Sequence, residues 1–346
     1  MTTTTSYRPE RCQDQIRQLN DMVSIVILNY NNKDFLRKSI TSALELDWPE
    51  LEVIVVDNAS SDGSHEMIES EFGNRIRLIR RQDNSAAAGR NEGFNTAVGN
   101  YVLSIDNDIV LTDRMVVRKA MSLFTQFPTV ALLAFKVGSV ENPEEPLPEH
   151  WWYPVPMVRG KDQLFFTDFF SEGAVFFRSE AIKASGGYDE MFCQYYEGND
   201  LALRLTRDGY DLLYCSSLSC AELRIRGFLG RSRNRVNYLS LRNKIWTAWK
   251  HYPLKRACPY LLGRIAVSAF RSARFGWFDL FVTALRDGFL APYAIRVQRQ
   301  PLNKETWAKI RDIHKGKFPE AIARKRGATC VPVPRVPRTS KEAVTD

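Results

Sequence analysis

Residues 51–63 read LEVIVVDNASSDG, so a run of apolar and β-branched residues ends in an acidic turn. Such a nearly continuous apolar run is typical of a parallel strand that is covered on both faces. A similar run, VSIVIL, occupies residues 23–28, and segments with a helical spacing of apolar residues lie between these runs and after them. This alternation predicts an α/β fold with a mostly parallel sheet and helices on both faces.

The strand and helix pattern continues through the first two thirds of the chain. We expect strands at residues 23–28, 51–56, 76–79, 101–105, 130–135, 174–177 and 212–215, and helices at 33–46, 64–72, 86–98, 114–127 and 200–207. Residues 138–160 hold five prolines and four glutamates, which indicates a loop.

The composition is that of a soluble globular protein. Of 346 residues, 44% are hydrophobic and 25% are charged, so a sizeable core can form. The first 21 residues are polar and lack the apolar region of a signal peptide, and no run of 18 apolar residues follows them. None of the six cysteines forms a CxxC pair, so reduced thiols in the cytoplasm are expected.

Positive charge is concentrated in the C-terminal third. The formal net charge is +8, yet residues 1–222 hold 21 Lys or Arg against 33 Asp or Glu, whereas residues 223–278 hold thirteen Lys or Arg and no acidic residue. Aromatic residues are interleaved with this charge, which predicts basic amphipathic helices. Such helices either lie on an anionic membrane surface or cap the acidic part of the chain. No nucleic-acid-binding motif is found, so no nucleic-acid partner is expected.

Acidic residues follow two of the predicted strands. Asp57 ends the strand at 51–56, and Asp106 and Asp108 end the strand at 101–105. Ligands of open α/β sheets bind at the carboxyl ends of the strands, so these carboxylates are expected at one edge. An extended Asp-x-Asp points both carboxylates to one side, and hard oxygen ligands suit Mg²⁺ or Mn²⁺ bridging a diphosphate. The alternative is a solvated acidic turn.

A segment rich in small residues, NSAAAGRNEG at 84–93, is the third candidate element. Its alanines and glycines would let the backbone approach a ligand closely, and Arg90 would then reach a phosphate or a base. The alternative is a tightly packed helix with Arg90 at its surface.

Six segments, in order along residues 22–245, resemble family 2 glycosyltransferases of the GT-A fold, especially bacterial rhamnosyltransferase-like members. They are VSIVILNYNN (23–32), VIVVDNASSDGS (53–64), NSAAAGRNEGF (84–94), YVLSIDND (101–108), GGYDEMFCQYYEGNDLALRLTRDGY (186–210) and YLSLRN (238–243). The resemblance implies a GT-A, Rossmann-like sheet and an inverting glycosyltransferase. Its donor would be a nucleotide-diphosphate-sugar and its acceptor a cell-surface glycan or a lipid-linked molecule, in cell-wall or polysaccharide biosynthesis.

The resemblance also implies roles for individual residues. It places Asp57 against the base or ribose, Arg90 against the nucleotide, Asp106 near the ribose and the metal, Asp108 on the metal and Asp189 on the acceptor side. Arg242 is a further candidate for the donor diphosphate. The implied cofactor is Mg²⁺ or Mn²⁺.

Two positions depart from the family pattern. Where the family usually has Glu-Asp, with the Asp read as the general base, this chain has Glu197-Gly198. Glu197 or Asp200 is then the candidate base, since both flank the predicted helix start. Where the family often has a metal-binding His, this chain has Glu222, whose carboxylate also suits Mg²⁺ or Mn²⁺. A catalytically impaired nucleotide-sugar-binding or scaffold protein of the same fold is therefore the alternative function.

The predicted organisation has four parts. They are an N-terminal tail at 1–21, a GT-A catalytic domain at 22–226, a basic amphipathic helical region at 227–315 and a disordered tail at 316–346. The catalytic domain would divide into a nucleotide-binding half at 22–110 and an acceptor half at 160–226. The expected location is the cytoplasm. If the basic helices lie on an anionic membrane surface, the protein would also attach peripherally to the inner face of the cell membrane.

Overall fold

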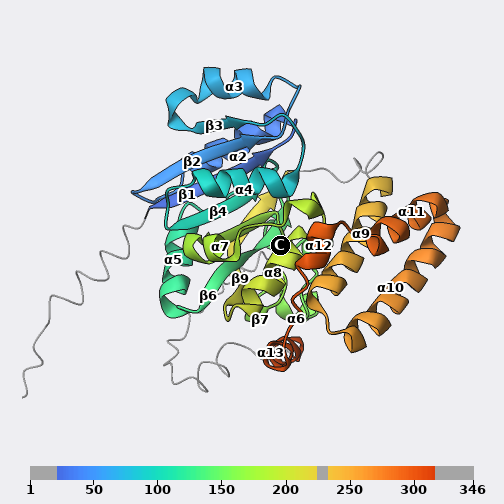
Figure 1. Cartoon of the computed structure of the whole chain (residues 1–346). Helices are drawn as coiled ribbons and strands as arrows, with labels where there is room; N and C mark the ends of the chain where they lie inside the picture. Colours follow the sequence, from blue (N-terminus) through green and yellow to red (C-terminus); the bar gives the residue numbers. More distant parts are fainter. Residues whose placement is uncertain (1–21, 224–232, 316–346) are drawn as a thin grey trace, which may run out of the picture.

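The computed structural model describes residues 22–223 and 233–315, which form one sheet, its covering helices and a group of C-terminal helices (Figure 1). The predicted tails at 1–21 and 316–346 lie outside the described residues, as does the predicted domain boundary at 226/227.

One mixed sheet forms the centre of the molecule. Its strand order is β3-β2-β1-β4-β8-β6-β9-β5, and β7 also pairs with β9. Strand β8 is antiparallel to both of its neighbours, but the three longest ladders, β6 with β9, β1 with β2 and β1 with β4, are parallel. The strands are β1 (Val23–Asn29), β2 (Leu51–Asp57), β3 (Arg77–Arg80), β4 (Tyr101–Asp106), β5 (Ile109–Val110), β6 (Val130–Ser139), β7 (Leu164–Thr167), β8 (Ala174–Arg178) and β9 (Asp211–Glu222).

The predicted strands are all present, each within a few residues of its predicted ends or extended beyond them. Strands β5 and β7 and helix α7 were not predicted, because runs of two to seven residues carry little periodicity. The predicted loop at 138–160 contains a 3₁₀ turn at Pro148–His150 and a short helix, α6, at Met157–Gly160.

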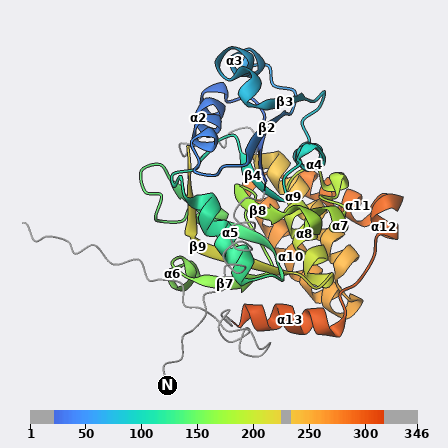
Figure 2. The same ribbon diagram turned by 90° about the vertical axis from the view of Figure 1, so that its left-hand side faces the viewer.

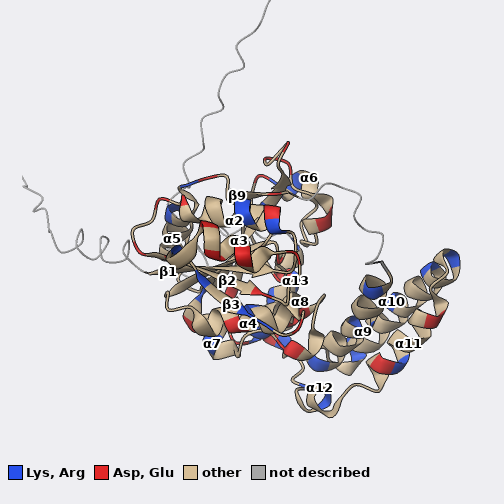
Figure 3. Cartoon of the chain, turned by 90° about the horizontal axis from the view of Figure 1, so that it is seen from above, with Lys and Arg blue, Asp and Glu red and all other residues tan. Residues whose placement is uncertain are grey.

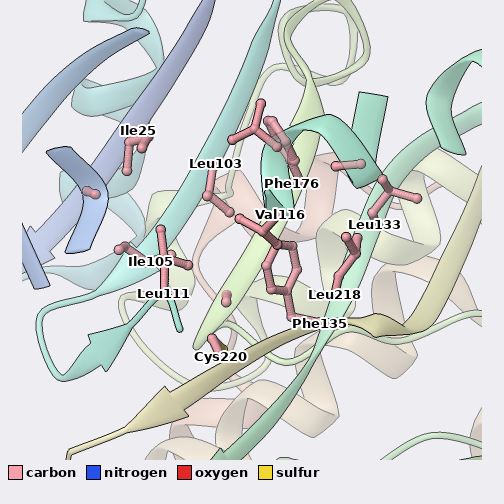
Figure 4. Close-up of a cluster of buried hydrophobic side chains, with 14 of the residues drawn as sticks. Ile25, Leu103, Ile105, Leu111, Val116, Leu133, Phe135, Phe176, Leu218 and Cys220 are labelled. Carbon is pink, nitrogen blue, oxygen red and sulfur yellow. The ribbon is translucent and has the colours of Figure 1, made fainter. Parts of the chain in front are cut away.

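Helices cover both faces of the sheet, as predicted. Alternate strand residues point to opposite faces, so Ile25 and Ile27 belong to the core that α2, α3 and α5 cover, while Val26 belongs to the core that α4, α7 and α8 cover. Figure 2 shows α2 and α4 on opposite sides of β2 and β4, and Figure 4 shows the apolar contacts on the α5 side, where Val116 meets Phe135 and Phe176. The helices are α2 (Lys33–Leu44), α3 (Ser64–Glu71), α4 (Ala86–Thr96), α5 (Val116–Gln126), α7 (Ser179–Ser185) and α8 (Glu197–Arg207).

The C-terminal helices form a second group beside the sheet. In Figure 3, α9, α10 and α11 lie together at one side of the molecule and carry many Lys and Arg residues. Their contact is close, because a Cβ at Gly288 of α11 would lie 2.5 Å from Cδ1 of Ile245 of α9. None of the helices within residues 22–223 and 233–315 has the length and apolar character needed to cross a bilayer. The helices are α9 (Arg233–His251), α10 (Leu254–Phe275), α11 (Phe278–Phe289), α12 (Tyr293–Val297) and α13 (Lys304–His314).

Candidate functional site

Asp57 ends β2 and lies beneath the carboxyl edge of the sheet. Asn29 donates from Nδ2 to Asp57 Oδ1 at 2.6 Å, the backbone N–H of Ser60 donates to Oδ2 at 2.9 Å, and His65 Nε2 lies 2.6 Å from the same oxygen. The Asp57 side chain is fully buried. It therefore ties β1 to the turn that follows β2, and it positions this turn from below.

An open hollow of about 580 Å³ lies beside the same turn. Asp62 Oδ2 accepts a hydrogen bond from the backbone N–H of Lys33 at 2.7 Å, which joins the two walls of the hollow. Asn31 and Asn32 have φ values of 57° and 59°, a left-handed conformation that Asn tolerates better than most residues. The hollow has the size of a small-molecule site. It is lined by Asn31, Asn32, Lys33, Asp34, Phe35, Ser61 and Asp62.

Helix α4 carries Arg90 into the interior. A Cβ at Gly93 would lie 2.4 Å from Val26 Cγ1, and a Cβ at Gly89 would lie 2.5 Å from Asn58 Oδ1. These glycines therefore allow close packing of α4 on β1 and β2, which differs from the expected close approach of this backbone to a ligand. The alternative prediction was a tightly packed helix with Arg90 at its surface. The helix is tightly packed, but Arg90 is buried.

Carboxylates from three other elements surround Arg90. Its Nη2 donates to Oδ1 of Asp106, at the end of β4, at 2.6 Å, and its Nε lies 3.7 Å from Oε2 of Glu172, in the loop before β8. Glu197, the first residue of α8, also acts electrostatically on Arg90. Burial alone would lower the pKa of Arg90, but these carboxylates raise it above its usual value. We call Arg90, Asp106, Glu172 and Glu197 the Arg90 cluster.

The carboxylates of the Arg90 cluster outnumber its single cation. Burial, opposed by Arg90 and assisted by Glu197, raises the pKa of Glu172 to about 7. Burial also raises the pKa values of Asp106 and Glu197, although Arg90 lowers both. A group of this kind favours the binding of a proton or a cation.

Asp108, Glu222 and His150 lie next to the Arg90 cluster. The carbonyl of Asp108 accepts from the backbone N–H of Leu223 at 2.7 Å, which holds the end of β9 beside the Asp-x-Asp segment. His150 Nε2 lies 2.9 Å from Glu222 Oε2. Glu222 raises the pKa of Asp106 and His150 lowers it, after the larger effects of burial, Arg90 and a further carboxylate.

This donor set has the chemistry that Mg²⁺ and Mn²⁺ require, because it offers several carboxylate oxygens at an edge with excess negative charge. Among the residues that the structure describes, no three His, Cys, Asp or Glu side chains are arranged to hold a metal ion. Arg90 contacts Asp106 and His150 contacts Glu222. These two candidate metal ligands therefore pair with protein side chains in this structure.

Asp200, one turn further along α8, lies in a different environment. It is fully buried and contacts Lys250 Nζ at 2.6 Å, Arg204 Nε at 2.8 Å and His251 Nε2 at 2.8 Å. Burial acts to raise its pKa, but the hydrogen bond from His251 and the charges of Arg204 and Lys250 hold it well below its usual range. Lys250 also contacts Asp189 at 2.7 Å. A carboxylate held so firmly is a poor proton acceptor, which favours an ion-pair role for Asp200. We call these five residues the Lys250 network.

Arg242 and its neighbour on α9 hold the loop that leads into α8. Arg242 donates to the carbonyl of Phe192 at 3.2 Å, and its guanidinium carbon lies 4.1 Å from the ring centroid of Trp246. Asn243 donates from Nδ2 to the carbonyls of Phe192, Gln194 and Tyr195. In this structure the Arg-Asn pair therefore fixes a loop.

The sequence alone does not reveal Glu172, His150 or Lys250 as residues of the site. Glu172 is a single acidic residue in an apolar segment, FFSEGAVFF, and that contrast was the available signal. His150 belongs to the proline-rich loop and reaches Glu222 across 72 positions of sequence. Lys250 stands among many basic residues, so its burial is invisible from the sequence.

The sheet, with its acidic edge at the ends of β2 and β4, defines the GT-A fold. The mannosyltransferase PcManGT from Pyrobaculum calidifontis, solved in complex with GDP-Man and Mn²⁺, is 17% identical with a TM-score of 0.52, and the match covers 90% of this chain and 88% of that one. TarS 1–349 of S. aureus, solved in complex with UDP-GlcNAc, is 16% identical with a TM-score of 0.53, and the match covers 88% of this chain and 92% of that one. At these identities the likeness shows the fold.

Residues 24–185 match the family model described as glycosyl transferase family 2. Glycosyltransferase GlyA of Streptococcus pneumoniae serotype 4 is 33% identical over 92 residues, which are 26% of this chain and 13% of the relative. The UDP-Glc:alpha-D-GlcNAc-diphosphoundecaprenol beta-1,3-glucosyltransferase WfaP of Escherichia coli is 34% identical over 89 residues, which are 25% of this chain and 36% of the relative. The chain thus spans 36% or less of the length of these relatives. The matches support a family 2 glycosyltransferase, and the rhamnosyltransferase-like subtype stays a prediction.

Proposed function

We propose that this protein is an inverting family 2 glycosyltransferase that moves a hexosyl or rhamnosyl group from a nucleotide-diphosphate-sugar to a glycan or lipid-linked acceptor. The process would be the synthesis of a cell wall or surface polysaccharide. The observation that carries the proposal is the buried Arg90 held against Asp106 at the carboxyl edge of the sheet. The nucleotide-sugars bound to PcManGT and TarS, and the diphosphoundecaprenol substrate in the name of WfaP, support it.

The residues of the edge have distinct tasks in this proposal. Asp57 positions the turn that holds the base or ribose, and Arg90 with Asp106 faces the donor diphosphate. Negative charge grows on the leaving diphosphate as its bond to the sugar breaks, and Arg90 stabilises this charge more in the transition state than in the ground state. Asp189 shapes the acceptor side, and Arg242, which holds the loop before α8, is a further candidate to contact the donor diphosphate.

A divalent cation, Mg²⁺ or Mn²⁺, belongs to the proposal, with Asp106, Asp108 and Glu222 as its ligands. When bound, such an ion would act as a Lewis acid toward the leaving diphosphate. The Mn²⁺ in the PcManGT complex and the excess of carboxylates at this edge support this part. We propose that His150, 2.9 Å from Glu222, orients this ligand.

Calorimetric titration tests the donor site. UDP, GDP, dTDP and their sugar conjugates would be titrated with and without Mn²⁺ into the wild type and Asp108→Asn. We expect one nucleotide class to bind with Mn²⁺, and binding to weaken about tenfold or more in Asp108→Asn. Asp47→Asn, at an exposed pair with Arg118, is the matched control and should bind normally. No binding to the folded wild type would overturn the proposal in favour of a scaffold protein, and binding without turnover would indicate a catalytically impaired one.

We also propose that the C-terminal helices attach the protein to the cytoplasmic, anionic face of the cell membrane. Val267, Phe270, Arg271 and Arg274 recur at helical spacing on α10 and are all exposed, Phe270 at 72%. Apolar and basic side chains on one stripe suit the interface of an anionic leaflet, where a lipid-linked acceptor would also lie.

Vesicle sedimentation tests the membrane surface. The wild type should pellet with phosphatidylglycerol vesicles, remain free with phosphatidylcholine vesicles and detach in high salt. Val267→Ser/Phe270→Ser should reduce the bound fraction about tenfold, because two apolar side chains that would insert into the bilayer interface are removed. The control is Val158→Ser, an exposed apolar residue on α6, outside the C-terminal helices. Equal binding to both vesicle types, or none to either, would contradict the proposal.

A further inference from the structure

The carboxylate of Glu172 lies where a side chain at position 198 would be. A Cβ at Gly198 would lie 2.0 Å from Oε1 and 3.0 Å from Cδ of Glu172, closer than a Cβ atom can approach. Gly198 is the second residue of α8 and is not among the glycines of positive φ, so its backbone does not require glycine. The missing side chain is therefore explained by the carboxylate of Glu172, which occupies the volume that a residue at 198 would fill.

We propose that Glu172 is the catalytic base, delivering from the loop before β8 the carboxylate that family members carry at the position of Gly198. The assignment rests on the proposed glycosyltransferase function and names the group that takes the proton of the acceptor.

The surroundings of Glu172 suit this role better than those of Glu197 and Asp200, the two candidate bases on α8. Its side chain is 23% exposed, whereas Glu197 is 3% exposed and Asp200 is fully buried within its ion pairs. Oε2 accepts a hydrogen bond from the hydroxyl of Tyr188 at 2.6 Å, and Oε1 has no hydrogen-bond partner among the described residues. Oε2 is thus anchored, and Oε1 is buried against α8 with its acceptor capacity unused. The terminal torsion of a glutamate turns easily enough to bring this oxygen to an acceptor hydroxyl.

The electrostatic environment agrees with the geometry. Glu172 faces Arg90 from α4, Glu197 from α8 and the hydroxyl of Tyr188, and its pKa of about 7 lies near neutral pH. A base of this strength is present in its ionised form in a large fraction of molecules and still takes up a proton effectively.

In the proposed step, the acceptor hydroxyl gives its proton to the Glu172 carboxylate. The acceptor oxygen forms a bond to the anomeric carbon of the donor sugar. The bond from that carbon to the β-phosphate oxygen breaks, and its electron pair leaves with the nucleoside diphosphate. The configuration at the anomeric carbon inverts, and a single carboxylate suffices as base.

Glu172→Gln is the first test, with Glu180→Gln on the exposed surface of α7 as control. Release of nucleoside diphosphate would be followed with UDP-GlcNAc, GDP-mannose and dTDP-rhamnose, using water or a membrane-lipid extract as acceptor. We expect Glu172→Gln to lose about 10²–10⁴-fold in turnover while nucleotide affinity stays within about threefold. The rise of wild-type turnover with pH near 7 should disappear in the residual activity of this variant.

Relocation of the carboxylate is the second test, and a purely structural role would not pass it. Gly198→Asp alone should be impaired, because its Cβ would collide with Glu172. Glu172→Ala/Gly198→Asp should recover at least about tenfold activity over Glu172→Ala, since it returns a base to the same volume.

The outcomes distinguish a wrong base assignment from a wrong proposed function. If the wild type turns over donor and Glu172→Gln stays within about threefold of it, the assignment of Glu172 is overturned and the proposed function stands. If the folded wild type neither binds nucleotides nor turns over donor, the proposed function is overturned, and the base assignment with it.

Discussion

The Arg90 cluster and the Lys250 network are two groups of buried carboxylates that meet on one helix, α8. Glu197 belongs to the first and Asp200, three residues later, to the second. In the Arg90 cluster one guanidinium serves three carboxylates, and burial raises the pKa values of all three. In the Lys250 network Asp200 alone has three nitrogen partners, and its pKa is lowered.

This difference separates acids that can exchange a proton from acids that hold the fold together. A carboxylate with raised pKa and an unpaired oxygen is ready for a ligand, a proton or a cation. A carboxylate surrounded by cations gives up that ability, but it fixes the elements that meet there. The Lys250 network joins α8, α9 and the segment at Asp189, so it connects the sheet domain to the C-terminal helices.

The largest expected effect would come from breaking the Lys250 network. Asp200→Asn should lower the free energy of unfolding by about 3–5 kcal/mol at pH 7, because Lys250 and Arg204 lose their shared counter-charge in a buried site and the hydrogen bond to His251 is weakened. The folded pKa of Asp200 lies below its unfolded value, so the lost stability should be fully present above the unfolded pKa and should vanish as the pH falls through the folded pKa. Urea unfolding between pH 2 and pH 8 measures the onset of this loss below the unfolded pKa.

Asp208→Asn is the matched control, since this residue pairs with Arg207 in an exposed position at the end of the same helix. We expect it to change stability by less than about 1 kcal/mol. Full stability of Asp200→Asn together with lost turnover would reverse our reading and return Asp200 to the catalytic role that the sequence suggested.

Much of the fold was predictable from the sequence because its signals are local. The apolar runs that become β1, β2 and β4 are nearly continuous, and each ends in polar residues at the edge. The parallel register then places Asn29 beside Asp57 and Leu28 beside Asp106 without further information. Short elements such as β5 and β7 depend on pairing with β9, and pairing with a distant strand leaves no periodic trace.

The site was predictable only in part, because some of its residues are brought together by contacts between distant segments of the chain. The positions of Asp57, Asp106 and Asp108 follow from the predicted strand ends, but those of Glu172 and His150 do not. Glu172 reaches the edge from a loop and His150 from a short 3₁₀ turn, and the sequence around them indicates neither contact. Gly198 looked like a lost base from the sequence, whereas the structure shows that a second residue fills its place.

Removal of the Glu172 charge should change the free energy of unfolding by less than Asp200→Asn does, and in the opposite direction. It is the second test of the difference between the Arg90 cluster and the Lys250 network. The folded pKa of Glu172, about 7, lies above its unfolded value of 4.5, so the folded state binds more protons between these values and loses stability as the pH rises through them. Glu172→Gln imitates the protonated form and should match the wild type near pH 4.5 but exceed it by roughly 1–3 kcal/mol above pH 7. Urea unfolding of both proteins across this range is the measurement, and Glu180→Gln should follow the wild type throughout. A Glu172→Gln variant that is less stable than the wild type at pH 8 would show that the Glu172 carboxylate, like Asp200, mainly stabilises its neighbours, and the distinction between the two groups would fail.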